Sequence, residues 1–196
     1  MVDSLAPDTV LPLLTGRFGR EVYRYEERCA STQRLLREDD PEGAVAATEE
    51  QTEGRGRLGR SWVAPAGSSV LFSVLLRPAV PPDRLPELSL VAGRALAAAL
   101  AAQTGLAAEV KFPNDVLVER RKVAGILAEA SAGRVVLGIG VNVSQRAEEL
   151  PERPQFPATS LALEGATVER PRLLAALLER LELEYDTWLE RYGAGG

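Results

Sequence analysis

Seven consecutive residues, 54–60, contain three glycines and three arginines, and this run restricts the fold more than any other part of the chain. Three guanidinium groups do not suit an apolar core, so the run must lie in a loop that water or a ligand can reach. Glycine lets backbone N–H groups approach a ligand closely, and arginine presents a planar cation to phosphate or carboxylate. By itself the run fits an anion-binding loop, a disordered patch for nucleic acid or a plain solvated loop.

The rest of the composition is that of an ordinary globular chain. Of the 196 residues, 45% are hydrophobic and 26% are charged, so we expect residues 1–196 to form a single domain with one core. The net charge of -5 argues against nucleic acid and membrane surfaces as partners, because any basic site must be local. We find no apolar stretch of the roughly 18 residues that span a bilayer, and residues 1–15 lack a signal-peptide pattern. The prediction is a cytoplasmic protein.

Histidine is absent from the sequence, and Cys29 is its only cysteine. These two facts exclude an internal disulfide, a thiolate metal cluster, imidazole metal sites and catalysis by Ser-His-Asp or Cys-His groups. Any enzymatic chemistry must therefore rest on lysine, arginine, aspartate, asparagine and backbone dipoles. Such groups suit reactions at phosphorus, in which charge stabilisation does most of the work.

Hydrophobic patterns predict mixed α and β structure without a linker or an internal repeat. Strands are predicted to begin at Tyr23 and to cover residues 43–48, 68–77, 108–112, 123–130 and 135–143. Helices are predicted from Ser31 or Thr32 to about Glu38, from Leu85 to Gln103 with Gly105 as the stop, and from Pro171 to about Tyr192. Short turns are expected at 113–115 and at Ala132-Gly133, and a proline-rich irregular stretch is expected up to about Pro157.

Two segments of the predicted sheet carry residues that a strand does not need. Turn formation does not explain a lysine on each side of the turn at 113–115, nor Gly125 inside the following strand, so we expect a pocket there. The later strand contains Gly138 and Gly140 and ends in Asn142. Either it is a bulged buried strand in which a turn satisfies the hydrogen bonds of Asn142, or its glycines make room for a flat ring and Asn142 forms hydrogen bonds with the edge of a base.

Taken in order, these segments resemble the catalytic domain of biotin protein ligases, also called biotin–[acetyl-CoA-carboxylase] ligases. The matching stretches are Ser31-Thr32-Gln33, Gln51 with residues 54–60 and Trp62, Lys111-Phe112-Pro113-Asn114-Asp115, residues 122–127 and residues 138–142. The resemblance implies an α+β fold, with a mixed β-sheet flanked by α-helices as in class II aminoacyl-tRNA synthetases. It also implies that biotin and MgATP give biotinyl-5′-AMP, from which a biotin carboxyl carrier protein of acetyl-CoA carboxylase takes biotin onto a lysine.

The resemblance assigns roles to individual residues. Catalysis falls to Lys122, Arg57 and Asp115, with Asp115 either orienting Lys122 or binding Mg²⁺. Biotin binding falls to Ser31, Thr32, Gln51, Gly54, Arg55, Arg57, Lys122 and Gly125. ATP and adenylate binding falls to Arg55, Arg57, Arg60, Trp62, Lys111, Asn114, Ile126 and Asn142. Some of these assignments also have a simpler interpretation. Ser31 and Thr32 would cap a helix, Trp62 would be a core residue, and Lys122 would be an exposed lysine beside Arg120 and Arg121.

The chain also departs from the family pattern. Leu58 stands where some members carry arginine, and Phe112 where tryptophan is common. Because only about twenty residues precede Tyr25, we expect no N-terminal helix-turn-helix domain and no DNA binding. We also expect the small C-terminal SH3-like domain to be missing, since the sequence ends at Gly196.

Three alternative functions and one mode of assembly stay open. A lipoate ligase or octanoyltransferase shares the general fold, although the Gly/Arg run with Gln51 favours biotin. A sensor would bind biotin or a nucleotide without turnover. A nucleic-acid module would bind single strands in a salt-sensitive way. An exposed sheet edge would allow a homodimer, as in some relatives.

Overall fold

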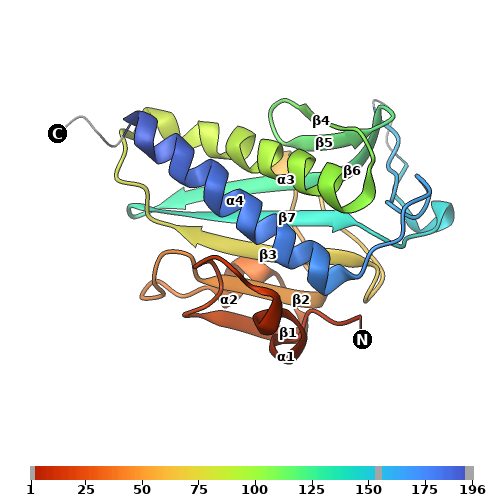
Figure 1. The fold of residues 1–196 in the computed structure, drawn as a ribbon, viewed down its shortest axis with the longest axis horizontal. Helices are drawn as coiled ribbons and strands as arrows, with labels where there is room; N and C mark the ends of the chain where they lie inside the picture. The colour runs from red at the N-terminus through yellow and green to blue at the C-terminus, as the bar shows by residue number, and fades with distance from the viewer. Residues whose placement is uncertain (1–2, 153–155, 193–196) are drawn as a thin grey trace.

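The computed structural model describes residues 3–152 and 156–192. Seven strands form one mixed sheet, and helices cover it (Figure 1). The predicted fold class, a mixed sheet flanked by helices, is therefore confirmed. The predicted irregular stretch before Pro157 includes residues 153–155, which lie outside the described residues.

The strands lie in the order β1-β2-β3-β7-β6-β5-β4 across the sheet. Only β1 and β2 are parallel to each other among these neighbours. Their bounds are β1 Tyr23–Cys29, β2 Val45–Gln51, β3 Ser69–Leu76, β4 Ala108–Lys111, β5 Asp115–Val118, β6 Arg121–Ser131 and β7 Arg134–Asn142. The sequence prediction missed β5. This four-residue strand starts at Asp115, inside the predicted turn at 113–115, and forms a hairpin with β4.

The helices are α1 Pro7–Val10, α2 Thr32–Leu35, α3 Leu88–Thr104 and α4 Arg170–Tyr192. The stop at Gly105 is confirmed, since Gly105 has a φ of 74° and its N–H bonds to the Ala101 carbonyl at 2.9 Å. The prediction for α2 was wrong in length, because α2 ends at Leu35 and Ser31 makes no side-chain capping bond. Residues before Leu88 form a separate 3-10 turn, Pro82–Glu87, as expected for a segment with two prolines.

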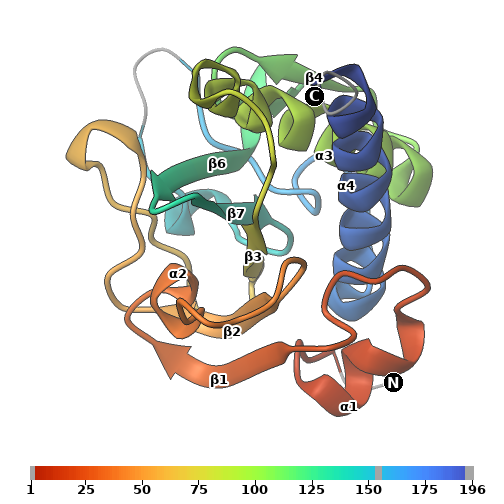
Figure 2. The same ribbon diagram turned by 90° about the vertical axis from the view of Figure 1, so that its left-hand side faces the viewer.

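Helices α3 and α4 lie against one face of the sheet and pack against each other (Figure 1). Alternate residues of β3 point to this face, so Val70, Phe72 and Val74 join the main core. The opposite face holds a smaller cluster that includes Leu75 and Leu36, and α2 contacts β2, β3 and β7 there. Figure 2 shows α3 and α4 on one side of the sheet and the segment after β2 arching away on the other. The two faces thus differ, one closed by long helices and the other by loops.

The segment Pro82–Thr104 is long and apolar enough to cross a membrane by length and composition. The expectation that no apolar stretch reaches this length was therefore wrong. Packing explains the apolar character, because α3 buries Val91, Leu96 and Leu100 in the core. A helix covered by a sheet on one side and a second helix on another needs apolar residues around much of its circumference.

Arg170 at the start of α4 ties together three distant parts of the chain. Its guanidinium donates to Glu49 Oε2 at 2.5 Å, to Asp3 Oδ2 at 3.0 Å and to the Ser69 carbonyl at 3.2 Å. Glu49 also accepts a bond from the Leu5 N–H at 2.7 Å. The side chains of Arg170 and Glu49 are 4% and 11% exposed, so each needs the other to remain charged away from water.

Asp40 anchors the loop between α2 and β2 in a similar way. Its carboxylate accepts bonds from Arg24 Nε at 3.0 Å and from the Arg37 N–H at 2.7 Å. The hydrogen bond from Arg24 lowers the pKa of Asp40 against the opposing effect of burial, and the Arg37 N–H lowers it further. Because Arg24 lies on β1, the pair fixes the loop to the edge of the sheet.

We predict that Arg170→Met lowers the free energy of unfolding by about 3–5 kcal/mol, because it leaves the Glu49 charge buried without its partner. Urea unfolding followed by circular dichroism measures this loss. The double variant Arg170→Met with Glu49→Gln should recover part of it, since no charge is then stranded. A single variant as stable as the wild type would show that the ion pair contributes nothing.

We predict that the pair formed by Asp40 makes stability depend on pH in acid. A carboxyl whose pKa is lowered by folding stabilises the protein above its unfolded pKa of about 3.9, and this contribution is lost as the pH falls through the lower folded value. Urea midpoints should therefore fall more steeply below about pH 4 in the wild type than in Asp40→Asn. Near pH 7 Asp40→Asn should be the less stable of the two. Parallel curves at all pH values would contradict the assignment.

Candidate active site

A cavity of about 910 Å³ opens on the face of the sheet opposite α3 and α4. Its walls come from the start of α2, the loop after β2, the turn between β4 and β5, and the middle of β6 and β7. Most residues predicted for the site line it. These are Ser31, Thr32, Gln51, Arg55, Arg57, Arg60, Trp62, Lys111, Asn114, Asp115, Lys122, Gly125 and Ile126. Residues as far apart in the sequence as Ser31 and Ile126 thus converge on one cavity.

Lys122 lies in the wall with its side chain only 9% exposed. Its ammonium donates a hydrogen bond to Asp115 Oδ1 and lies 5.7 Å from the centre of the Trp62 ring. The Lys122 backbone is fixed as well, because its N–H bonds to the Pro157 carbonyl and its carbonyl accepts from the Thr159 N–H. The interpretation of Lys122 as an exposed lysine in a basic turn is therefore wrong. Its charge is held at one place beside the cavity.

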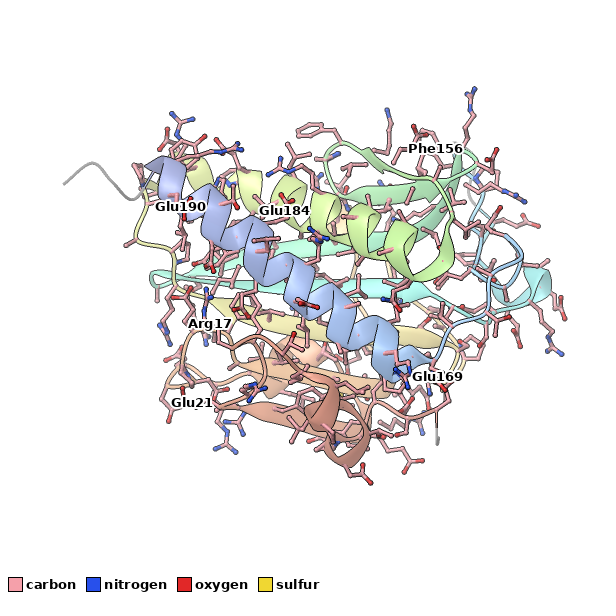
Figure 3. The ribbon with its side chains drawn as sticks, viewed as in Figure 1. Arg17, Glu21, Phe156, Glu169, Glu184 and Glu190 are labelled. Atoms are coloured by element: carbon pink, nitrogen blue, oxygen red, sulfur yellow. The ribbon has the colours of Figure 1, made fainter. Side chains whose placement is uncertain are left out.

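Lysine usage offers a sequence signal for this site. Lys111 and Lys122 are the only lysines in the sequence, where every other basic residue is arginine, and both line the cavity. The Lys111 ammonium lies 5.6 Å from the centre of the Phe156 ring, another wall residue. Figure 3 labels Phe156 beside the ends of β4 and β5. A chain that uses arginine elsewhere retains the compact ammonium only where the cavity is.

One end of the cavity is lined with neutral polar groups. The Thr32 N–H donates to Gln51 Oε1 at 2.8 Å, and the Thr32 hydroxyl lies 3.2 Å from the same oxygen and 2.7 Å from Ser73 Oγ. Ser31 is buried beside them. These contacts hold the Gln51 amide in one orientation. This end therefore suits a neutral ligand group that both donates and accepts hydrogen bonds.

The floor of the cavity is built from glycines on neighbouring strands. Gly125 of β6 lies opposite Gly140 of β7, and a Cβ at either position would come within 2.8 Å or 2.6 Å of the Trp62 ring. The flat ring for which these glycines make room is thus the indole of Trp62. The indole N–H is buried against Gly140 and has no hydrogen-bond partner among residues 3–152 and 156–192.

The Gly/Arg run forms a hairpin-like loop over the cavity. The Trp62 N–H bonds to the Gly54 carbonyl at 2.8 Å, and the Gly56 N–H bonds to the Arg60 carbonyl at 2.7 Å. At the tip, Arg57 Nη1 donates to Asn114 Oδ1 at 3.3 Å. Leu58 has a φ of 59° and is 84% exposed, an unfavourable arrangement for a large apolar residue that is typical of functional loops. The loop therefore spans the cavity from its base to the β4–β5 turn.

Two predicted site residues lie away from the cavity. Asn142 is buried and donates to the Thr159 carbonyl at 2.9 Å, while its Oδ1 accepts from Gln145 at 3.1 Å. Its amide is thus satisfied within the protein, as the simpler interpretation expected, although partly by the distant Thr159, and β7 pairs with both neighbours without a bulge. Gly54 closes the base of the loop, where a Cβ would lie 2.3 Å from the Trp62 carbonyl oxygen. Its role in this structure is close backbone packing.

Other wall residues received no role from the sequence. Gln33 lies against Gly138, where a Cβ would meet the Gln33 side chain at 3.1 Å, and its amide donates to the Leu127 carbonyl at 3.3 Å. Phe112 is 75% exposed at the turn between β4 and β5. The sequence could have predicted Gln33 as a wall residue, because it belongs to the matching Ser-Thr-Gln stretch. No sequence pattern indicated Phe156, because it lies in an irregular segment.

The arrangement suits a reaction between two anions. A buried ammonium, a neutral polar group and a loop that carries three arginines line the same cavity, so negative charge can be stabilised inside it. No group of three or more Asp, Glu, Cys or His side chains placed to hold a metal ion occurs in the described part of the chain. Asp115 and Glu152 are the carboxylates among the described residues that line the cavity.

Comparisons with known proteins agree with this geometry. A sequence model of the biotin/lipoate A/B protein ligase family matches residues 25–145. The biotin–[acetyl-CoA-carboxylase] ligase of Mycobacterium tuberculosis is 42% identical over 158 residues, which cover 76% of this chain and 56% of that protein. The bifunctional ligase/repressor BirA of Bacillus subtilis is 33% identical over 175 residues, which cover 84% of this chain and 54% of that protein.

The fold is also similar to solved structures. Biotin protein ligase from Aquifex aeolicus, in complex with biotin and ATP, superposes with a TM-score of 0.78 at 34% identity, covering 88% of this chain and 73% of that one. This chain spans about half the length of the first curated relatives that it matches. Because the family match extends over the strands and the loop that form the cavity, the chain belongs to the biotin/lipoate A/B protein ligase family.

Proposed function

We propose that this protein is a biotin protein ligase that activates biotin with ATP and transfers it to a lysine of a biotin carboxyl carrier protein of acetyl-CoA carboxylase. The observation that carries the proposal is the buried Lys122 ammonium, held by Asp115 in the cavity that the polar Thr32 and Gln51 and the arginine loop also line. The cavity volume lies within the range of ligand sites in proteins. The relatives named as biotin–[acetyl-CoA-carboxylase] ligases support the choice of substrate and acceptor.

In the first step a biotin carboxylate oxygen attacks the α-phosphorus of ATP. A new P–O bond forms, the bond to the β-phosphate oxygen breaks, and pyrophosphate leaves with the electron pair. Thr32 and Gln51 bind the neutral ureido ring, while Lys122 lies beside the carboxylate and the α-phosphate and offsets the charge that develops there. Arg57 and Arg60 neutralise the phosphates, Arg55 adds positive charge to the loop, and the Trp62 ring packs beside the adenylate.

In the second step the amine of the acceptor lysine attacks the carbonyl carbon of biotinyl-5′-AMP. The new C–N bond replaces the C–O bond, AMP leaves, and the amine loses a proton. AMP is a far weaker base than the oxide that free biotin would have to expel, which is why activation precedes transfer. The loop over the cavity limits access of water to the anhydride between the steps.

Magnesium accompanies ATP in such reactions, and the donor set here is compatible with it. Mg²⁺ in nucleotide sites usually takes one or two protein carboxylates, and phosphates and water supply the rest. Asp115 would hold it and would also keep Lys122 in place, so the two roles considered for Asp115 do not exclude each other. The metal would supply charge neutralisation at the phosphates.

Location and assembly belong to the same proposal. We place the ligase in the cytoplasm, where ATP and the carrier are available. A homodimer through a sheet edge is part of the proposal as well, because β1 and β4 are the outer strands of the sheet and outer strands can pair with a second copy.

We predict that Lys122→Ala lowers the rate constant for biotinyl-AMP formation by about 10²–10³-fold, because it removes a fixed cation from the reacting centre. Mass spectrometry of biotinyl-AMP and pyrophosphate measures the product, with lipoate as a competing acid. Lys122→Arg serves as the matched variant that keeps the charge and should lose less. Wild-type protein that binds biotin but forms no adenylate would exclude the ligase and favour a sensor. A preference for lipoate would identify a lipoate ligase.

We predict that alanine at two glycines of β7 weakens the binding of different substrates. Gly140→Ala forces the Trp62 indole to move and should raise the KM for ATP by about ten-fold, the equivalent of roughly 1.4 kcal/mol. Gly138→Ala instead presses on Gln33, near the polar end, and should raise the KM for biotin. Steady-state kinetics with each substrate varied in turn measures both. If the two variants changed the same KM equally, the assignment of the two ends would be wrong.

A further inference from the structure

Arg55 of the Gly/Arg loop forms an ion pair outside the cavity. Its Nη2 atom lies 2.7 Å from Oε2 of Glu129, near the end of β6. Glu129 does not line the cavity, and none of the roles assigned above involves it. The contact joins residues 74 positions apart in the sequence, so it attaches the loop to the sheet.

The strand pairing explains why Glu129 reaches the loop. In β6 the residues Gly125, Leu127 and Glu129 alternate toward the same face of the sheet, opposite Gly140, Gly138 and Val136 of β7. Gly125 and Leu127 line the cavity. Glu129 is therefore the next residue on the cavity face, just beyond the rim, where a carboxylate can reach the outer side of the loop.

The loop is held at three places. Its base is closed by the hydrogen bond between Gly54 and Trp62, and its tip contacts Asn114 through Arg57. The pair between Arg55 and Glu129 is the third, and it lies three residues farther along β6 than Ile126, to which Asn114 is hydrogen-bonded. A loop fixed only at its base and at its tip would be unattached along the side that carries Arg55. The Glu129 carboxylate holds that side.

We propose that Glu129 is a positioning residue that holds the Gly/Arg loop closed over the cavity through Arg55. It does not touch the reacting atoms. The proposal has two consequences: the loop opens less often, and an activated intermediate escapes more slowly. Only the second consequence rests on the proposed ligase function.

The first test measures the loop directly, without any substrate. The exposed arginines of the loop are trypsin sites, and a loop that opens more often is cut faster. For Glu129→Gln we expect cleavage after Arg57 and Arg60 to be about two- to five-fold faster than in the wild type, as expected for a half-exposed ion pair. Mass spectrometry of the fragments under limiting trypsin measures the rates.

The matched control is Glu184→Gln, which also removes a half-buried glutamate from an ion pair, with Arg94 at 3.2 Å. Figure 3 shows Glu184 on α4, on the other side of the sheet from the loop. Cleavage of the loop should be unchanged in this variant. The exchange Arg55→Glu with Glu129→Arg should restore slow cleavage after Arg57 and Arg60, whereas each single reversal should speed it.

Wild-type cleavage rates in Glu129→Gln, or an exchange variant no slower than the single reversals, would overturn the proposal. A second test measures the escape of biotinyl-AMP as biotin transferred to an added lysine-rich bystander protein. Glu129→Gln should raise this labelling about two- to five-fold at an unchanged rate of adenylate formation. If the wild type makes no adenylate, the proposed function fails, whereas the trypsin result still decides the role of Glu129.

Discussion

Gly125 and Gly140 face each other across β6 and β7, and the Trp62 indole packs on the surface that they leave bare. This close packing depends on two absent side chains, because a Cβ on either strand would occupy the space of the ring. The position of Trp62 in turn fixes the base of the Gly/Arg loop and one side of Lys122. The cavity therefore derives its shape from the register between two antiparallel strands.

The electrostatics of the site follow from the same packing. Lys122 is surrounded by the indole, the Asp115 carboxylate and the segment at Pro157. Removal of an ammonium from water costs free energy unless a partner compensates it, and Asp115 provides that compensation. The positive charge is consequently fixed before any substrate enters, so little reorganisation is needed when charge develops during reaction. The arginines of the loop supply the remaining charge around it.

The sequence predicted the fold class and most of the cavity, because its signals are local. The strand ending at Asn142, the helix that stops at Gly105 and the Gly/Arg loop each follow from patterns within about twenty residues. Local signals also misled: turn chemistry at 113–115 concealed β5, and the apolar character of Pro82–Thr104 was underestimated. Asn142 was open to two interpretations, and the choice depended on Thr159, which is distant in the sequence.

The sequence by itself determined which chemistry is available: no histidine, two lysines, one arginine-rich loop and a set of strand glycines. The sequence also determined the family, since the order of the motifs along the chain can be read without a structure. Only the tertiary structure decided which ring fills the space above the glycines, and that Glu129 meets Arg55. The physical reason is that such contacts depend on strand register and on how a loop crosses the sheet. Both are set by packing between segments far apart in the chain, which no local pattern encodes.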